Sequence, residues 1–328
     1  MSRAALGPAL ALALVGLALA SLAIGDRAIP AAELLGALAG DRASAPASAM
    51  IVLDLRLPRV ALAALAGAAL GAAGAVAQTV MRNPLAEPGL LGINAGAAVA
   101  ALAGGLWLHG LPATLTPWFA FAGALGMAAA IWGLSWRGGT SSIRIILVGI
   151  GLNAMAGAAA AFISLFAEIT ALQRMQAWLA GSVAQARWET VWPLAAWTLP
   201  GLALALAASR ELDLLAFGAQ TARALGQRAQ LAAGLAVALC ALLAAAAVAA
   251  VGPVAFVGLI APHLARRLAG PSHLARLPAA AASGALLLMA ADLVGRTAIA
   301  PTQIPAGLLT TLIGAPFFAW LLWRGRHA

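Results

Sequence analysis

The side chains that most often perform catalysis are scattered along this sequence. His109, His263, His273 and His327 lie far from any carboxylate and from one another in the chain. No HExxH, CxxC or GxSxG pattern is present, so the motifs of zinc hydrolases, redox dithiols and serine hydrolases are missing. We therefore expect the chain to hold no metal or cofactor and not to be an enzyme by itself.

The basic residues exclude one further activity. All 19 basic residues are arginine, and the chain has no lysine. A P-loop uses its Lys to reach the phosphates of ATP. This sequence therefore has no classical ATP site, and any ATP hydrolysis must come from another chain.

A few polar side chains interrupt the apolar runs. Gln78, Asn94 and Asn153 are amides within or at the edge of such runs. Each fits two interpretations equally well, since intramembrane amides either join packed helices or line a path. Asp292 is the only acid deep in an apolar run, and Arg296 follows it at the i,i+4 spacing of a helical ion pair. An acidic relay of the kind that a proton-coupled carrier needs is not visible.

Three arginines need a reason for their positions. Arg56 and Arg59 bracket Leu57-Pro58 at the expected start of a helix, where a cation opposes the helix dipole. Arg296 lies at the same expected side of the membrane. Either an acidic partner compensates for these charges, or the side chains extend to the membrane interface. The residues alone leave both interpretations open.

The composition is that of a membrane protein. The chain is 63% hydrophobic and 9% charged, with mean hydropathy +0.98, and it shows no strand-like alternation. We predict one all-α, polytopic domain over residues 1–328. The net charge of +9 does not indicate nucleic acid, because the arginines are scattered at helix ends. The single cysteine, Cys240, excludes an internal disulfide and is expected to pack in the core.

Hydropathy predicts ten membrane spans, since about 20 apolar residues cross a bilayer. The first is read as an uncleaved helix rather than a signal peptide. A polar segment, Asp26 to Asp54, separates it from the second. A short amphipathic piece at 171–180 and a short eighth span broken by Pro262 are also expected. The predicted spans are 4–24, 59–81, 92–108, 117–136, 143–166, 188–207, 229–251, 255–268, 279–296 and 304–323.

Loop arginines predict the orientation. With a cytoplasmic N-terminus, twelve of the 19 arginines lie inside and seven outside. Both termini are then cytoplasmic. The seven outside are Arg27, Arg42, Arg56, Arg59, Arg174, Arg187 and Arg296.

The cytoplasmic run 211–227 is unusually polar and favours helix. Leu214, Leu215, Ala222 and Leu225 sit beside charges there. Such a segment suits docking against a soluble partner, and a simple surface helix is the alternative.

Five ordered motifs together resemble the iron-chelate and vitamin B12 (FecCD-type) permeases of bacterial ABC importers. The resemblance extends over nearly the whole chain. The motifs are Arg56-Leu-Pro-Arg59, Asn83-Pro-Leu-Ala-Glu-Pro-Gly-Leu-Leu-Gly92, Trp178-Leu-Ala-Gly-Ser182, Gly252-Pro-Val-Ala-Phe-Val-Gly-Leu-Ile-Ala-Pro-His263, and Asp292…Arg296 with Ile304-Pro-Ala-Gly.

The resemblance implies a fold and partners. It implies the vitamin B12 importer permease fold with ten spans in the bacterial inner membrane. It further implies a dimer with a second copy or a related chain, surrounding lipid, a periplasmic substrate-binding protein and cytoplasmic ABC ATPase subunits. The cargo is expected to be a ferric siderophore or haem. Cobalamin is the alternative, and an ion-coupled secondary transporter is a distant one.

The resemblance also implies roles for particular residues. Arg56, Arg59 and Arg296 would receive acidic side chains of the binding protein. Gln78 would be the polar side chain offered to a passing ligand. The remaining implied positions are a gate at Asn83 and Leu85, a second gate at Thr140, Ser141 and Ser142, and ATPase coupling at Ala219, Arg223, Leu225 and Gly226.

Overall fold

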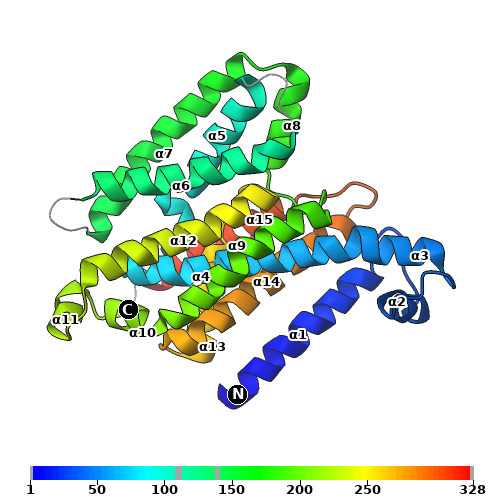
Figure 1. Ribbon diagram of the computed structural model, residues 1–328, viewed down its shortest axis with the longest axis horizontal. Helices are drawn as coiled ribbons and strands as arrows, with labels where there is room; N and C mark the ends of the chain where they lie inside the picture. The colour runs from blue at the N-terminus through cyan, green and yellow to red at the C-terminus, as the bar shows by residue number, and fades with distance from the viewer. Residues whose placement is uncertain (1–2, 108–112, 137–140, 326–328) are drawn as a thin grey trace.

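A computed structural model of the chain is built from helices. It describes residues 3–107, 113–136 and 141–325, and no strand occurs within those ranges. Ten helices correspond to the ten predicted spans (Figure 1). They are α1 (Arg3–Ala23), α4 (Leu57–Val80), α5 (Ile93–Trp107), α6 (Thr116–Leu134), α7 (Ser142–Leu165), α9 (Trp188–Ala207), α12 (Ala229–Val251), α13 (Val257–Ala269), α14 (His273–Thr297) and α15 (Ala306–Gly325).

Eight of these helices are long and apolar enough to cross a membrane. The other two are α5, a shorter apolar helix of 15 residues, and α13, which has 13 residues and two arginines in its last turn. The predicted short eighth span corresponds to α13, and Pro262 lies inside that helix rather than breaking it. The all-helical fold class is therefore confirmed.

Shorter helices occupy the connections. The predicted amphipathic piece is α8 (Ile169–Leu179), and the predicted cytoplasmic segment contains α10 (Ser209–Ala216) and α11 (Ala219–Ala224). The helix α2 (Ala31–Leu38) was not predicted, because it lies in a segment interpreted as polar linker. Single turns of 3₁₀-helix lie at Pro88–Leu91 and Ala113–Leu115.

The second span begins earlier than the sequence predicted. A short helix α3 (Pro46–Met50) and a π-helical stretch (Ile51–Arg56) lead without a break into α4, giving one helical run of 35 residues from Pro46 to Val80. At 1.5 Å per residue such a run is about 52 Å long, against about 30 Å of bilayer hydrocarbon. The prediction of a polar segment extending to Asp54 was wrong, because its last third is the first part of this helical run.

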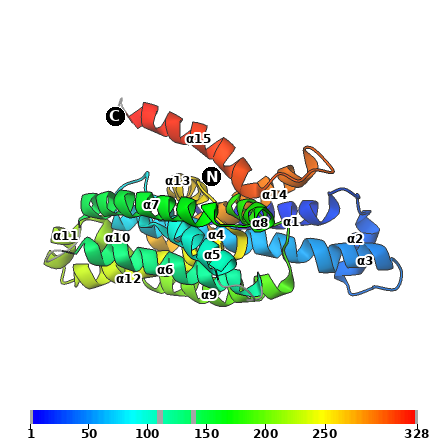
Figure 2. The same cartoon turned by 90° about the horizontal axis from the view of Figure 1, so that it is seen from above.

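The helix α4 lies at the centre of the molecule. In Figure 1 it runs between α12 and α14, with α5 to α8 grouped on one side and α1 on the other. Nearly every residue of its second half is buried. Figure 2 shows α15 standing off from the other helices. The predicted packing role of Cys240 is confirmed, since its thiol is fully buried and donates to the carbonyl oxygen of Ala73 in α4 at 3.3 Å.

Glycines allow α4 to approach its neighbours at backbone distance. A Cβ atom on Gly67 would collide with the carbonyl oxygen of Gly284 in α14, and one on Gly71 with that of Ala280. A Cβ on Gly74 would collide with the carbonyl oxygen of Gly258 in α13. Small residues give this close approach in membranes, where packing replaces the hydrophobic effect between helices.

Adding one methyl group at this crossing tests the packing. We expect Gly67→Ala to destabilise the chain by about 1–3 kcal/mol, the usual cost of overpacking, although alanine favours helix intrinsically. Thermal unfolding in detergent measures the change. Gly126→Ala in α6 is the matched control, because nothing lies within 4 Å of a Cβ there. Equal unfolding temperatures for the two variants would contradict the packing account.

Candidate functional site

Arg56 binds the end of the first helix. The residue is 7% exposed, and its guanidinium donates to the carbonyl oxygens of Leu22 at 2.7 Å and Ala23 at 3.0 Å. A further bond reaches the carbonyl oxygen of Arg27 at 2.5 Å. The last carbonyls of a helix lack partners within it and carry partial negative charge. Arg56 therefore caps α1 from the π-helical stretch that leads into α4.

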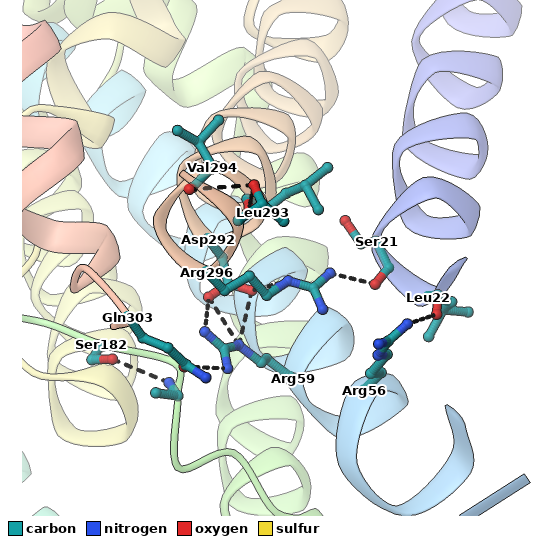
Figure 3. A network of polar contacts seen from close by, with 12 residues as sticks. Ser21, Leu22, Arg56, Arg59, Ser182, Asp292, Leu293, Val294, Arg296 and Gln303 are labelled. Atoms are coloured by element: carbon teal, nitrogen blue, oxygen red, sulfur yellow. Dashed lines mark hydrogen bonds and ion pairs between the residues drawn. The ribbon is translucent and has the colours of Figure 1, made fainter. Parts of the chain in front are cut away.

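Arg296 of α14 reaches the same helix end. It is 5% exposed and donates to the carbonyl oxygen of Ser21 (Figure 3). Gly25 leaves room for the two guanidiniums, since a Cβ there would lie 2.6 Å from Nη2 of Arg56 and 3.4 Å from Nη1 of Arg296. Two arginines from two helices thus hold the end of α1.

Asp292 links this group to Arg59. Its carboxylate accepts from Nη2 of Arg59 at 2.8 Å and from Nε at 3.0 Å. The predicted i,i+4 partner Arg296 is more distant, at 3.8 Å. Nη1 of Arg59 donates to the side chain of Gln303 at 2.9 Å. We call Arg56, Arg59, Asp292 and Arg296 the outer arginine cluster (Figure 3).

The contacts within the outer arginine cluster bear on the predicted docking role of its arginines. Arg56 and Arg59 do not begin a helix, because the helical run starts at Pro46, so they do not oppose an N-terminal dipole. Their charges already have acceptors within the chain. Of the three predicted docking residues Arg59 is the most accessible, with 12% of its side chain exposed. Docking through these residues stays a prediction.

The C-terminal end of α4 passes into a turn that places two predicted gate residues. Arg82 adopts a left-handed conformation with φ 47°. The amide of Asn83 bonds the carbonyl of Gln78, and the amide of Arg82 bonds that of Thr79, which is the Schellman pattern. The side chain of Asn83 then accepts from the amide of Leu85 at 2.9 Å. Asn83 and Leu85 are half-buried and share this turn.

Other predicted path residues lie elsewhere. Gln78 is 5% exposed, and its amide points to the carbonyl of Leu259 in α13 at 3.5 Å, so in this structure it faces a neighbouring helix. Ser141 is the N-cap of α7 and accepts from the amide of Arg144 at 3.3 Å. Ser142 is the first residue of α7, and Thr140 lies outside the described residues. Their roles in a path stay predictions.

The segment predicted to couple to the ATPase folds as the two short helices α10 and α11. Gly218 between them has φ 97° and Gly226 after them has φ 84°, values that favour glycine. Leu225 is 61% and Phe217 is 70% exposed. Arg223 is also exposed, whereas Ala219, the first residue of α11, is half-buried. The segment presents an apolar and basic surface.

A pairing that sequence reasoning missed lies at the same end. His273 was judged isolated from carboxylates, yet its Nδ1 lies 2.5 Å from Oδ1 of Asp213. Its Nε2 lies 2.6 Å from the hydroxyl of Thr79. Burial raises the pKa of Asp213, but the bonds from His273 and Ser272 outweigh that effect and hold the pKa below its ordinary value. Because the three residues are far apart in the chain, only the fold reveals them.

Two of the sequence motifs meet in the interior. Glu87 accepts from the amide of Phe256 at 3.3 Å, at the start of α13. A Cβ on Gly258 would lie 2.7 Å from Pro88. The motif that ends at Ser182 also packs here, because the amide of Ser182 bonds the carbonyl of Val251 at 2.8 Å. The three motifs therefore pack against one another.

Comparisons with known proteins agree with this architecture. A family model described as the FecCD transport family matches residues 12–324. The iron(3+)-hydroxamate import system permease protein FhuG of Bacillus subtilis (strain 168) is 38% identical over 282 residues, covering 84% of each chain. The hemin transport system permease protein HmuU of Yersinia pestis is 40% identical over 285 residues, again covering 84% of each.

A solved structure has the same fold. It is described as a metal-chelate type ABC transporter in an inward-facing conformation. It matches with a TM-score of 0.84 and 29% sequence identity, covering 96% of this chain and 98% of that one.

Removing one charge from the outer arginine cluster tests its contribution to stability. Asp292→Asn leaves Arg59 and Arg296 without their shared carboxylate, so we expect a loss of about 3–5 kcal/mol, as for a broken buried ion pair. Asp54→Asn is the matched control, since Asp54 pairs with Arg42 at 3.3 Å on an exposed surface where a pair is worth under about 1 kcal/mol. The free energies of unfolding of the two variants are compared in detergent. A smaller loss for Asp292→Asn than for the control would refute the assignment.

Proposed function

The chain belongs to the FecCD transport family, and from that premise we propose that it is the permease subunit of an ABC importer for an iron chelate. Its relatives are permeases for iron(3+)-hydroxamate and hemin. The observation that carries the proposal is the family match over residues 12–324, together with a fold shared with a metal-chelate type ABC transporter. The cargo class is therefore a ferric siderophore or haem, and cobalamin is the alternative.

The energy comes from a separate chain in this proposal. A P-loop needs a lysine, and this sequence has none. The exposed surface of α10 and α11, with Phe217 and Leu225, is where we place the ATPase subunits. An apolar patch beside charges suits a protein interface. ATP closure of the ATPases would move these helices.

The orientation follows from the arginine distribution. The end of α15 lies towards the same end of the molecule as α10 and α11, and α1 runs away from that end towards α2 (Figure 1). With the arginine-rich loops inside, we place that end in the cytoplasm and the protein in the inner membrane. The outer arginine cluster then faces the periplasm.

A second permease subunit completes the path. The helix α15 stands off from the bundle (Figure 2), and several of its large apolar side chains are exposed. We propose that this helix contributes to a contact with a second copy or a related chain, with the path between the two subunits. The exposed side chains are Leu308, Leu312, Ile313, Trp320, Leu322 and Trp323.

The gate and the docking site lie at opposite ends of α4. We place the cytoplasmic constriction at Asn83 and Leu85, in the turn that follows α4. We place docking of an acidic binding protein at the outer arginine cluster, with Arg59 as the first contact because it is the most accessible of the three arginines. Alternating access then needs movement at the inner turn.

The proposed function is tested by uptake in proteoliposomes. The permease is reconstituted with its ATPase and with the binding protein loaded with a ferric siderophore or with haem. We expect uptake of one of these chelates that requires ATP and stops when the Walker A lysine of the ATPase is replaced. Uptake that continues without a working ATPase would contradict the proposal. Uptake of cobalamin alone would favour the alternative cargo.

Docking has its own test. We expect Arg59→Glu to weaken association with the binding protein, and rising salt to weaken the unmodified pair because exposed charge pairs are screened. The affinity is measured by immobilising the permease on a surface and adding the binding protein in solution. Arg42→Glu is the control, because Arg42 is also on the outer side but is exposed and paired with Asp54. Equal affinity for the Arg59 variant and the unmodified permease would place docking elsewhere.

A further inference from the structure

A short polar chain crosses three helices at the inner end of the molecule. Asp213 lies on α10, His273 begins α14, and Thr79 lies in the last turn of α4. The imidazole joins the other two, with Nδ1 at 2.5 Å from the carboxylate and Nε2 at 2.6 Å from the hydroxyl. His273 is fully buried and Thr79 is 4% exposed. We call this set the inner polar chain.

Asp213 also caps α14 from outside that helix. The amide of His273 donates to Oδ1 of Asp213 at 2.8 Å, and the hydroxyl of Ser272 donates to Oδ2 at 3.3 Å. The N-cap residue Ser272 makes no capping bond with its own side chain. An acceptor at a helix N-terminus satisfies free amides and suits the dipole. A residue of an eight-residue helix thus holds the start of a 25-residue one.

Arg276 completes the hydrogen bonds of the inner polar chain. Its Nη2 donates to the carbonyl of Ala75 at 3.0 Å and to the hydroxyl oxygen of Thr79 at 3.3 Å. The hydroxyl of Thr79 lies 2.9 Å from the carbonyl oxygen of Ala75 as well, so two acceptors compete for its one proton. In the arrangement in which Arg276 alone satisfies that carbonyl, the hydroxyl of Thr79 donates to Nε2 of a neutral His273. Nδ1–H of the same ring then donates to Asp213. Asp213, His273 and Thr79 each have a partner, whereas Nε of Arg276 has none among the described residues. Buried hydrogen-bond networks restrain the groups that they join.

The order carboxylate, imidazole, hydroxyl is also that of a hydrolytic relay. A relay needs a hydroxyl that meets substrate, and Thr79 is closed off within the last turn of α4. The geometry therefore assigns a positioning role to these residues and not a catalytic one.

A second contact joins the same parts of the chain. Arg82, the left-handed residue that follows α4, lies against Gly218 between α10 and α11. A Cβ on Gly218 would be 2.9 Å from Nη1 of Arg82. Both residues have positive φ, 47° and 97°. The turn with Asn83 and Leu85 therefore touches the coupling helices at a point separate from the inner polar chain.

We propose that the inner polar chain transmits the movement of α10 and α11 to the gate turn after α4. This inference rests on the proposed function, because it takes α10 and α11 as the ATPase contact. Thr79 lies four residues before Asn83, so a displacement of Asp213 reaches the gate through one rigid imidazole. The same displacement of Asp213 also moves the start of α14, which Asp213 caps. Hydrogen-bond networks and packed side chains between two sites carry coupling of this kind.

The test separates transport from ATP hydrolysis in the full complex of permease, ATPase and loaded binding protein. Thr79→Val keeps the shape of the side chain and removes the hydroxyl. Asp213→Asn keeps the shape and removes the charge. For each we expect ATP hydrolysis to persist while chelate uptake per ATP falls about fivefold or more, the lower range of coupling between two sites. Thr79→Ser keeps a hydroxyl at this position, so its uptake per ATP should stay close to that of the unmodified complex.

The test includes a matched control variant and a second readout, which reports the gate directly. Thr297→Val removes a hydroxyl that bonds only carbonyls of its own helix α14, so its uptake per ATP should be unchanged. Leu85→Cys reports the gate by thiol labelling, because Cys240 is fully buried. ATP should change the labelling rate of Leu85→Cys, and adding Asp213→Asn should abolish that change.

Two results would overturn the inference. One is unchanged uptake per ATP in both Thr79→Val and Asp213→Asn. The other is a parallel fall of uptake and ATP hydrolysis that follows only the amount of assembled complex, as a purely structural role requires. Failure of the proposed function looks different, because the unmodified complex would then import no chelate.

Discussion

A buried guanidinium must find acceptors, and much of this structure follows from that requirement. Arginine keeps its charge in proteins and presents five donors. Arg56 and Arg296 are 7% and 5% exposed, and they use the carbonyls at the end of α1, which lack partners within their own helix. Asp292 supplies the carboxylate for Arg59. The arginines just before α4 and on α14 thereby hold the end of a first helix most of whose residues are not buried.

The two ends of α4 consequently differ. The outer end is bonded to α1 and α14 by charged side chains. The middle is packed at backbone distance through Gly67, Gly71 and Gly74. The inner end passes into a turn that has a non-glycine residue at φ 47° and half-buried residues at Asn83 and Leu85. Because α4 is bonded at one end and closely packed along its length, we propose that an ATP-driven change acts at the turn that follows it.

The sequence predicted the spans because hydropathy is a local property. It also located the amphipathic helix α8 and the polar segment of α10 and α11. It did not predict the helical start at Pro46, because Ala, Pro and Ser between Asp26 and Asp54 were interpreted as linker. It paired Asp292 with Arg296 by spacing, whereas the stronger bonds come from Arg59, 233 positions away in the chain. Likewise His273 meets Asp213 and Thr79 only through helix packing, which no local pattern encodes.

The central claim is that α4 is fixed at its outer end and moves at its inner turn. Hydrogen–deuterium exchange of the full complex, compared with and without ATP while the binding protein is present, tests it most directly. We expect ATP to change amide protection in residues 81–92 and 209–226. Amide protection at the end of α1 and in the helical turn that holds Arg56 and Arg59 should stay unchanged. Altered protection at the end of α1 with none in residues 81–92 would contradict it.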